Sequence, residues 1–233
     1  LLRLTAALQR EKHFASHAAH ELRTPISALK IHLHNLESEV PEGSSALEHA
    51  NEGIERMRHL VEQLLDLART QPELIKANFQ AIDLHTVAQR VTAECWPAFE
   101  QRGQSVSLHG EDAVMQGDEA MLAVLLRNLL DNARKYTPVG GEISVFAGCR
   151  DGVPTLEVAD TGPGIPPAER QHVFERFYRV TAQVREGVSG AGLGLAITQH
   201  IVQLHGAQVQ LTDSHLGSGL AVVVRFPNAM GTR

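Results

Sequence analysis

The chain has 233 residues, a formal net charge of −6 and 43% apolar residues, which is enough sequence for one or two globular domains. The negative charge argues against nucleic acid as the main ligand. The two cysteines, Cys95 and Cys149, form neither a metal-binding spacing nor a disulfide framework, and no run of 18 apolar residues offers a membrane span.

The first predicted element is a helix over residues 1–40, because apolar residues recur there at heptad spacing. On that spacing His20 falls outside the apolar seam, next to Glu21. Pro25 follows one turn later and cannot donate the helix hydrogen bond, which predicts a kink. A histidine beside an acid on the exposed side of a helix suits a nucleophile with a neighbouring base.

Two other interpretations of this histidine are open. Surface histidines on amphipathic helices are commonly only solvated, and the chain has 13 of them. A zinc site is the second alternative, since His13, His17 and His20 share one helix face. The zinc pattern His-Glu-x-x-His is absent, because Thr24 occupies the place of the second histidine.

A second helix is predicted to follow a turn at residues 41–45. Ser45 and Glu48 form a capping box, and apolar residues then repeat at helical spacing as far as Ala68. Two helices joined by a short turn make an antiparallel hairpin with apolar surface left on both helices. Pairing with a second copy would bury that surface as a four-helix bundle, so we expect a homodimer.

The rest of the chain has a different pattern. Residues 71–78 are predicted to link a helical domain, 1–70, to a second domain, 79–228. The second domain is predicted to be an α/β sandwich, because hairpin-length connections join its strands. Helices are expected over 83–98, 118–136 and 193–205, and strands over 105–109, 142–149, 155–159, 209–213 and 220–226.

The helix over 118–136 carries the first group of candidate ligand-binding residues. Asn128 and Asn132 are one turn apart on one face, and Lys135 lies beside them. Amide oxygens coordinate hard cations, and a lysine neutralises phosphate. Taken alone, two asparagines on a helix are usually surface residues, but the leucines around these two indicate a largely buried helix.

The second group follows the strand over 155–159. Asp160 at the end of this strand can accept a hydrogen bond from an exocyclic amine such as that of adenine. Gly162 and Gly164 allow the backbone to turn tightly and approach a flat ligand. Asp-x-Gly is also a common turn, so this group by itself is weak evidence.

The third and fourth groups lie further along the chain. Residues 174–179 read Phe-Glu-Arg-Phe-Tyr-Arg and precede a polar stretch, 180–189, that is predicted to be a mobile lid. Glycines at 190, 192 and 194 lead directly into a helix, whose first N–H groups would face an anion. This is neither a Walker A motif nor a Rossmann turn.

The order and spacing of these groups identify a family. His20-Glu-Leu-Arg-Thr-Pro25 resembles the phosphoacceptor box of bacterial sensor histidine kinases. Residues 128–136, 160–165, 174–179 and 190–195 resemble the N, G1, F and G2 boxes of the same family. The resemblance implies an all-α hairpin that forms a dimeric four-helix bundle, followed by the α/β sandwich shared by gyrase, the ninety-kilodalton heat-shock chaperone and mismatch-repair ATPases.

For the phosphoacceptor domain, the resemblance implies that His20 attacks the γ-phosphate of ATP. Glu21 would orient the ring or take its proton, and these two roles stay open. Thr24 would position water for dephosphorylation of a partner regulator.

For the nucleotide site, the resemblance implies that Asn132 holds Mg²⁺ against the phosphates of ATP. Asn128 and Lys135 would line the phosphate path, Tyr136 would pack near adenine or ribose, and Asp160 would accept the adenine amine. The same resemblance assigns to this site Gly162, Gly164, Ile165, Phe177, Arg179, Gly190, Gly192, Leu193, Gly194 and Leu195.

The expected function is autophosphorylation of His20 and transfer to an aspartate of a response regulator receiver domain, with phosphatase activity toward it. The resemblance also implies the cytoplasmic portion of an inner-membrane protein, with no direct membrane contact and no nucleic acid partner. The alternatives are a silent ATP-binding scaffold and an ATP hydrolase of the same fold. Hydrolysing relatives carry a glutamate where this chain has Asn128, and an amide is not a general base.

Overall fold

The computed structural model of the chain describes residues 79–175, 178–180 and 192–228. The chain divides into two compact units, Leu1–Gln71 and Pro72–Arg233, and every described residue belongs to the second unit. The predicted helical hairpin, its dimer seam, the linker over 71–78 and the polar stretch over 181–189 therefore lie outside the described residues.

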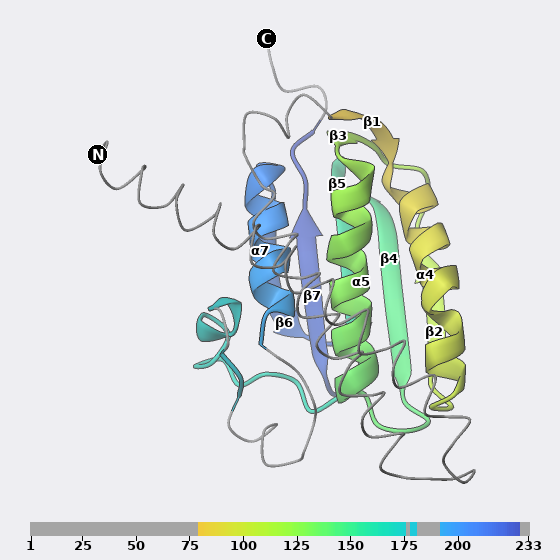
Figure 1. The fold of residues 1–233 in the computed structure, drawn as a ribbon, viewed down its shortest axis with the longest axis vertical. Helices are drawn as coiled ribbons and strands as arrows, with labels where there is room; N and C mark the ends of the chain where they lie inside the picture. The colour runs from red at the N-terminus through yellow and green to blue at the C-terminus, as the bar shows by residue number, and fades with distance from the viewer. Residues whose placement is uncertain (1–78, 176–177, 181–191, 229–233) are drawn as a thin grey trace, which may run out of the picture. The chain divides into compact units, whose positions relative to one another are not determined.

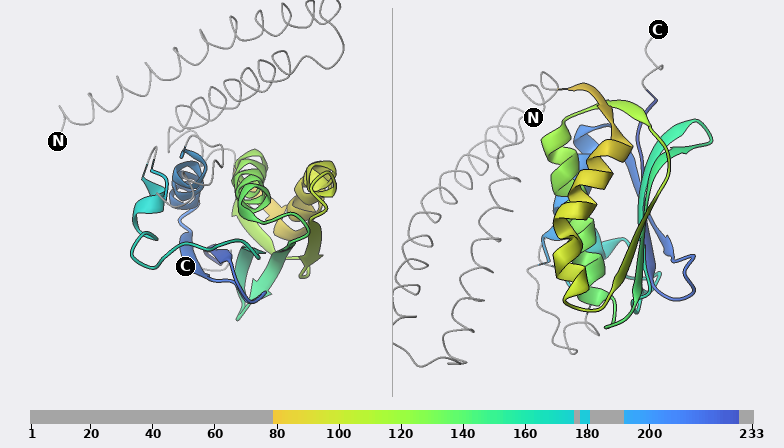
Figure 2. Two further views of the ribbon diagram at one scale, coloured as in Figure 1. Left: turned by 90° about the horizontal axis from the view of Figure 1, so that it is seen from below. Right: turned by 90° about the vertical axis from the view of Figure 1, so that its right-hand side faces the viewer.

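The second unit is a two-layer sandwich in which helices cover one face of a five-stranded sheet (Figures 1 and 2). Among the described elements, none covers the other face of the sheet, as the right-hand view of Figure 2 shows. The helices are α4 (Leu84–Glu100), α5 (Glu119–Tyr136) and α7 (Gly194–Leu204), with a short 3₁₀ helix η2 (His172–Phe174). The strands are β1 (Gln80–Asp83), β2 (Ser105–His109), β3 (Val114–Gly117), β4 (Glu142–Arg150), β5 (Val153–Asp160), β6 (Gln208–Asp213) and β7 (Leu220–Arg225).

The sheet is mixed, with strand order β2-β4-β5-β7-β6. Strands β2 and β4 run parallel, and the other neighbours are antiparallel. The register places Val145 opposite Val158 and Val158 opposite Val222, and all three are buried. Because residues paired across neighbouring strands point to the same face of a sheet, these three valines form one buried apolar row.

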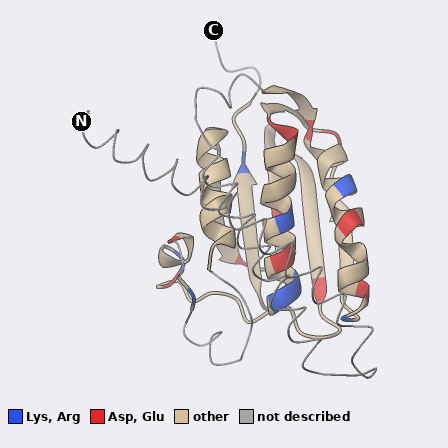
Figure 3. Cartoon of the chain, viewed as in Figure 1, with Lys and Arg blue, Asp and Glu red and all other residues tan. Residues whose placement is uncertain are grey.

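Two of the helices begin where the sequence predicts, because each starts at an aspartate that caps it. The Asp83 carboxylate accepts hydrogen bonds from the first-turn amides of His85 and Thr86, and the Asp118 carboxylate accepts one from Met121. Charged residues lie along α4 and α5 (Figure 3), while Leu125, among the leucines of α5, is fully buried. The α/β sandwich and the helices and strands predicted for the second domain are confirmed, with ends that differ by one or two residues.

The sequence analysis missed a small second sheet. Strands β1 and β3 pair antiparallel, with buried Ile82 opposite buried Met115. Each strand has four residues, which is too short for an alternation of apolar and polar residues to be recognised. The pairing brings the start of the described chain to the N-terminal end of α5 (Figure 1).

Candidate nucleotide-binding site

Asp160 is the last residue of β5, and the residue is only 7% exposed. Its Oδ1 accepts hydrogen bonds from the amide of Gly162 at 2.8 Å and from the amide of Leu220 at 3.3 Å. Burial raises the pKa of Asp160, and the two amide donors oppose that rise. Within the described residues, both bonds fall on Oδ1, so Oδ2 remains to accept a bond from a ligand amine.

The glycine-rich loop after Asp160 packs closely against two neighbours. A Cβ at Gly162 would lie 2.8 Å from the carbonyl oxygen of Tyr136, and a Cβ at Gly164 would lie 3.0 Å from that of Gly219. Ile165, which ends the loop, is buried at 9% exposure. The loop therefore touches both the C-terminal end of α5 and the hairpin between β6 and β7.

That hairpin contributes two residues that the sequence analysis missed. Gly219 has φ +115°, and a Cβ built on it would lie 2.0 Å from the carbonyl oxygen of Asp160. Leu220, the next residue, supplies the amide that holds Asp160 Oδ1. The sequence signal was the pair of glycines at 217 and 219 directly before a strand, which indicates a close backbone approach.

The phosphate end of the candidate site lies between α5 and the start of α7. A Cβ at Gly194 would lie 3.5 Å from Asn132 Nδ2 and 3.7 Å from Asn128 Oδ1, so the two amides face the first turn of α7. This helix begins after Leu193 without a side-chain cap. Such an uncapped helix start suits an anion, and binding of one at this position stays a prediction. Asn128 is 7% exposed.

The C-terminal end of α5 carries a compact group of charges. The ammonium of Lys135 lies 2.5 Å from Asp131 Oδ2, and the guanidinium of Arg134 lies 2.8 Å from Asp131 Oδ1. Burial acts to raise the pKa of Asp131, but the two cations outweigh it and the pKa is lowered. Lys135 therefore lies beside the predicted phosphate path with an acidic partner that the sequence analysis did not foresee.

Tyr136 links the N and F boxes. Its hydroxyl hydrogen-bonds with the Arg179 side chain, and burial raises the pKa of this tyrosine although the Arg179 charge lowers it. Asp160 and Gly162 thus contact α5 at Tyr136, and Gly194 lies against Asn132 one turn earlier on the same helix. The structure brings these residues together, and it places Ile165, Gly192, Leu193 and Leu195 on the adjoining loop and helix start.

The remaining candidate residues are not described. His20, Glu21 and Thr24 of the phosphoacceptor box lie outside the described residues, as do Phe177 of the F box and Gly190 of the G2 box. The zinc alternative on His13, His17 and His20 falls in the same part of the chain.

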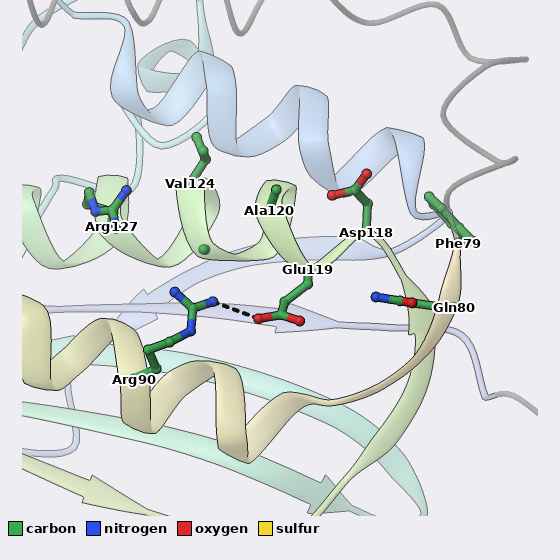
Figure 4. A pocket seen from close by; sticks show the side chains of 9 residues that line it. Phe79, Gln80, Arg90, Asp118, Glu119, Ala120, Val124 and Arg127 are labelled. Atoms are coloured by element: carbon green, nitrogen blue, oxygen red, sulfur yellow. Dashed lines mark hydrogen bonds and ion pairs between the residues drawn. The ribbon is translucent and has the colours of Figure 1, made fainter.

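A separate pocket of about 900 Å³ lies at the other end of α5, where β1 and α4 meet it (Figure 4). Phe79 and Ala120 line it, and the guanidinium of Arg90, held 2.8 Å from Glu119, stands at its side. None of the predicted nucleotide-binding residues lines this pocket.

Comparison with known proteins places both parts of the chain in one family. Residues 117–230 match the histidine kinase-, DNA gyrase B- and HSP90-like ATPases. Residues 10–73 match the His Kinase A phospho-acceptor domain.

Curated relatives are sensor proteins. The sensor protein kinase PmrB of Pseudomonas aeruginosa is 36% identical over 229 residues, which are 97% of this chain and 48% of that protein. The sensor protein QseC of Escherichia coli is 34% identical over 220 residues, which are 92% of this chain and 47% of that protein. The chain spans about half the length of these relatives.

Solved structures show the same likeness. Full-length ShkA in complex with AMPPNP has a TM-score of 0.72 at 26% identity, over 95% of this chain and 47% of that one. The mycobacterial sensor histidine kinase MprB has a TM-score of 0.55 at 32% identity, over 64% of this chain and 97% of that one. In the part of this chain that the structure describes, no helix combines the length and the apolar character that a membrane crossing requires.

Proposed function

The chain belongs to the sensor histidine kinases, the protein kinases of two-component signal transduction, and we propose that it binds ATP along α5 and phosphorylates its own His20. The observation that carries this proposal is the row of contacts along α5, from Asp160 and Gly162 at Tyr136 to Gly194 at Asn132. A carboxylate acceptor stands at one end of this row. Amide side chains and a helix N-terminus stand at the other.

At the base end, Asp160 Oδ2 accepts a hydrogen bond from the exocyclic amine of adenine. Its orientation is set beforehand, because two backbone amides hold Oδ1. Glycine at 162 lets the loop pack against the Tyr136 carbonyl, where a Cβ would collide, and so holds the loop close to Asp160. This arrangement favours adenine over guanine, since guanine presents a carbonyl oxygen where adenine has its amine.

At the phosphate end, the donors of this chain fit a magnesium nucleotide. Mg²⁺ keeps several water and phosphate ligands and needs few protein oxygens, so the single amide oxygen of Asn132 is a suitable donor. When bound, the metal ion would neutralise charge on the phosphates. Asn128, Lys135 and the first turn of α7 line the same path. Arg179 reaches it from the F box through its contact with Tyr136.

The transfer step joins the two domains. A ring nitrogen of His20 attacks the γ-phosphorus in line, a P–N bond forms, and the bond to the β,γ-bridging oxygen breaks as ADP leaves. Glu21 orients the ring or takes the proton that the imidazole releases. Asn128 is an amide and cannot activate water as a general base, so hydrolysis is slow compared with transfer.

The other parts of the proposal rest on the family. The domains are 1–70 for phosphotransfer and dimerisation and 79–228 for nucleotide binding, with 71–78 as linker. We propose that the protein is a homodimer, that a response regulator receiver domain takes the phosphoryl group, and that Thr24 supports the reverse dephosphorylation. We place the chain on the cytoplasmic side of an inner membrane. It has no direct membrane contact and no nucleic acid partner.

The test is incubation with γ-labelled ATP and Mg²⁺, comparing the unaltered chain with His20→Ala, Asn132→Ala and a control, His17→Ala. Acid-labile, base-stable label on the unaltered chain and on His17→Ala, and none on the other two, is expected. Label retained by His20→Ala would show that another residue is the phosphoacceptor. Tight ATP binding without any label would favour the silent scaffold. Label that appears when His20→Ala and Asn132→Ala are mixed would show transfer across the dimer.

A further inference from the structure

Arg170 lies in the segment between the glycine-rich loop and η2, and its side chain is only 20% exposed. The guanidinium makes three contacts. Its Nε donates to the carbonyl oxygen of Ile165 at 3.0 Å, and its Nη1 donates to that of Leu211 at 3.4 Å. Its Nη2 donates to the carboxylate of Asp213. One side chain therefore binds three residues on two separate segments.

Both segments contribute a backbone amide that binds the carboxylate of Asp160, the proposed acceptor for adenine. Ile165 closes the loop that begins at Asp160, whose Gly162 amide holds Asp160 Oδ1. Leu211 and Asp213 are near the end of β6, and the hairpin that follows returns the amide of Leu220 to the same oxygen. The two donors that orient the carboxylate thus sit on the two segments that Arg170 joins.

From this arrangement we infer that Arg170 is a positioning residue for the nucleotide: it holds the glycine-rich loop against the β6–β7 hairpin, so that the base end of the site is formed before ATP arrives. The inference rests on the proposed ATP-binding function and assigns a residue that no box of the family resemblance contains.

The two carbonyl contacts matter more than the ion pair. The carboxyl side chain of Asp213 is 87% exposed, and exposed ion pairs contribute little because water and salt screen them. The carbonyl oxygen of buried Ile165, by contrast, loses a charged donor when the guanidinium is removed. Lysine has a single ammonium in place of the planar, forked guanidinium, so it cannot reach the carbonyl oxygens of Ile165 and Leu211 at the same time. The geometry therefore requires arginine.

A purely structural role would predict something different. An arginine that only stabilised the folded chain would affect every ligand equally, through the fraction of folded protein. A positioning residue at the base end affects ligands that carry a base and spares those that carry only phosphates. Removing it raises the KM for ATP in autophosphorylation and leaves the rate at saturating ATP nearly unchanged, because the phosphate end of α5 is untouched.

The experiment measures binding by the full chain to ATP and to tripolyphosphate, both with Mg²⁺, at a temperature where circular dichroism shows every variant folded. The variants are Arg170→Leu, Arg170→Lys and a matched control, Arg90→Leu, in which the lost arginine pairs with Glu94 and Glu119 away from the site. Arg170→Leu is expected to weaken ATP binding about tenfold and to change tripolyphosphate binding less than about twofold. Arg170→Lys is expected to be intermediate, and Arg90→Leu is expected to match the unaltered chain.

Two results would overturn the inference. One is ATP binding by Arg170→Leu that equals that of the unaltered chain, and the other is an equal loss for ATP and tripolyphosphate. Failure of the unaltered chain to bind ATP would instead overturn the proposed function. The comparison of ligands therefore separates the failure of the inference from the failure of the function on which it rests.

Discussion

The backbone amide of Leu220 donates a hydrogen bond to Asp160 Oδ1 across 60 residues of sequence. The amide of Gly162 donates to the same oxygen, so the carboxylate is fixed in orientation although burial raises its pKa. A carboxyl group whose pKa is raised by folding lowers stability at neutral pH, because the unfolded chain ionises it at less cost. The chain therefore keeps a destabilising charge at the position where the proposed function needs an acceptor.

The substitution Asp160→Asn tests this balance. The asparagine oxygen can keep both backbone donors, but its NH₂ group would then face the adenine amine, donor against donor. We expect ATP affinity to fall roughly 10- to 150-fold, the equivalent of about 1.5–3 kcal/mol. The free energy of unfolding at pH 7 is expected to rise, since the buried charge is gone. Calorimetric titration with ATP and urea unfolding measure the two effects.

The matched control for that substitution is Glu157→Gln. Glu157 is also a buried carboxylate of β5, but it alternates to the other face of the sheet, where Arg150 and His215 pair with it. Removing its charge is expected to lower stability and leave ATP affinity unchanged. A gain of stability in Glu157→Gln, or none in Asp160→Asn, would contradict the account of the two carboxylates.

Two glycines of the β6–β7 hairpin provide a second test. Both have positive φ, +112° at Gly217 and +115° at Gly219, so alanine is strained at either position. Only at Gly219 would a Cβ meet another group, the carbonyl oxygen of Asp160 at 2.0 Å, whereas nothing lies within 4 Å at Gly217. We expect Gly217→Ala to lose about 1 kcal/mol of stability and to bind ATP normally.

Gly219→Ala is expected to lose more than this and also to lose ATP affinity, because the hairpin must move away from Asp160. Urea unfolding and ATP titration of the pair decide the matter. Equal behaviour of the two variants would show that the hairpin does not shape the site.

Local sequence signals predicted the helices and most strands of this fold. Asp83 and Asp118 cap their helices within a few residues, so the helix starts are encoded nearby. Strands β1 and β3 were missed because each is four residues long and takes its place from pairing with the other, more than 25 residues away.

The candidate site divides in the same way. Asp160, Gly162 and Asn132 belong to short motifs, and the structure brings them to one surface. Arg170 and Leu220 belong to no motif that we recognised, and their contacts depend on a hairpin that approaches from 41 and 60 residues away. Such contacts follow from the register of the sheet, which the sequence alone did not supply.

Asp131 provides a prediction about charge beside the phosphates. Its carboxylate pairs with Lys135 and Arg134 and so cancels part of their positive charge. We expect Asp131→Asn to strengthen ATP binding about two- to fivefold at low salt, and Lys135→Gln to weaken it by a similar factor. Both effects are expected to shrink at 0.5 M salt, where the screening length is roughly half its physiological value. Weaker binding by Asp131→Asn would mean that the carboxylate acts chiefly to hold Lys135 in place.

His205 lies at the C-terminal end of α7, with its side chain almost fully buried. Its Nε2 accepts a hydrogen bond from the amide of Asp118 at 3.2 Å, so its Nδ1 carries the proton that is donated to the carbonyl oxygen of Ile201 at 2.8 Å. The ring stacks on Phe79, with centroids 4.7 Å apart. These contacts fit only the neutral imidazole, because a proton on Nε2 would face the Asp118 amide.

The histidine therefore makes stability depend on pH. Burial lowers the pKa of His205, although the Ile201 carbonyl and the Asp118 charge oppose the shift. Below the ordinary histidine pKa of about 6.5, the unfolded chain binds a proton that the folded chain excludes, so the free energy of unfolding falls as pH falls through this value. Urea unfolding between pH 8 and pH 5 is expected to show this loss in the unaltered chain and a smaller loss in His205→Gln. The control His172→Gln, at an exposed position, is expected to keep the slope of the unaltered chain. Equal slopes in all three proteins would contradict the assignment of this pH dependence to His205.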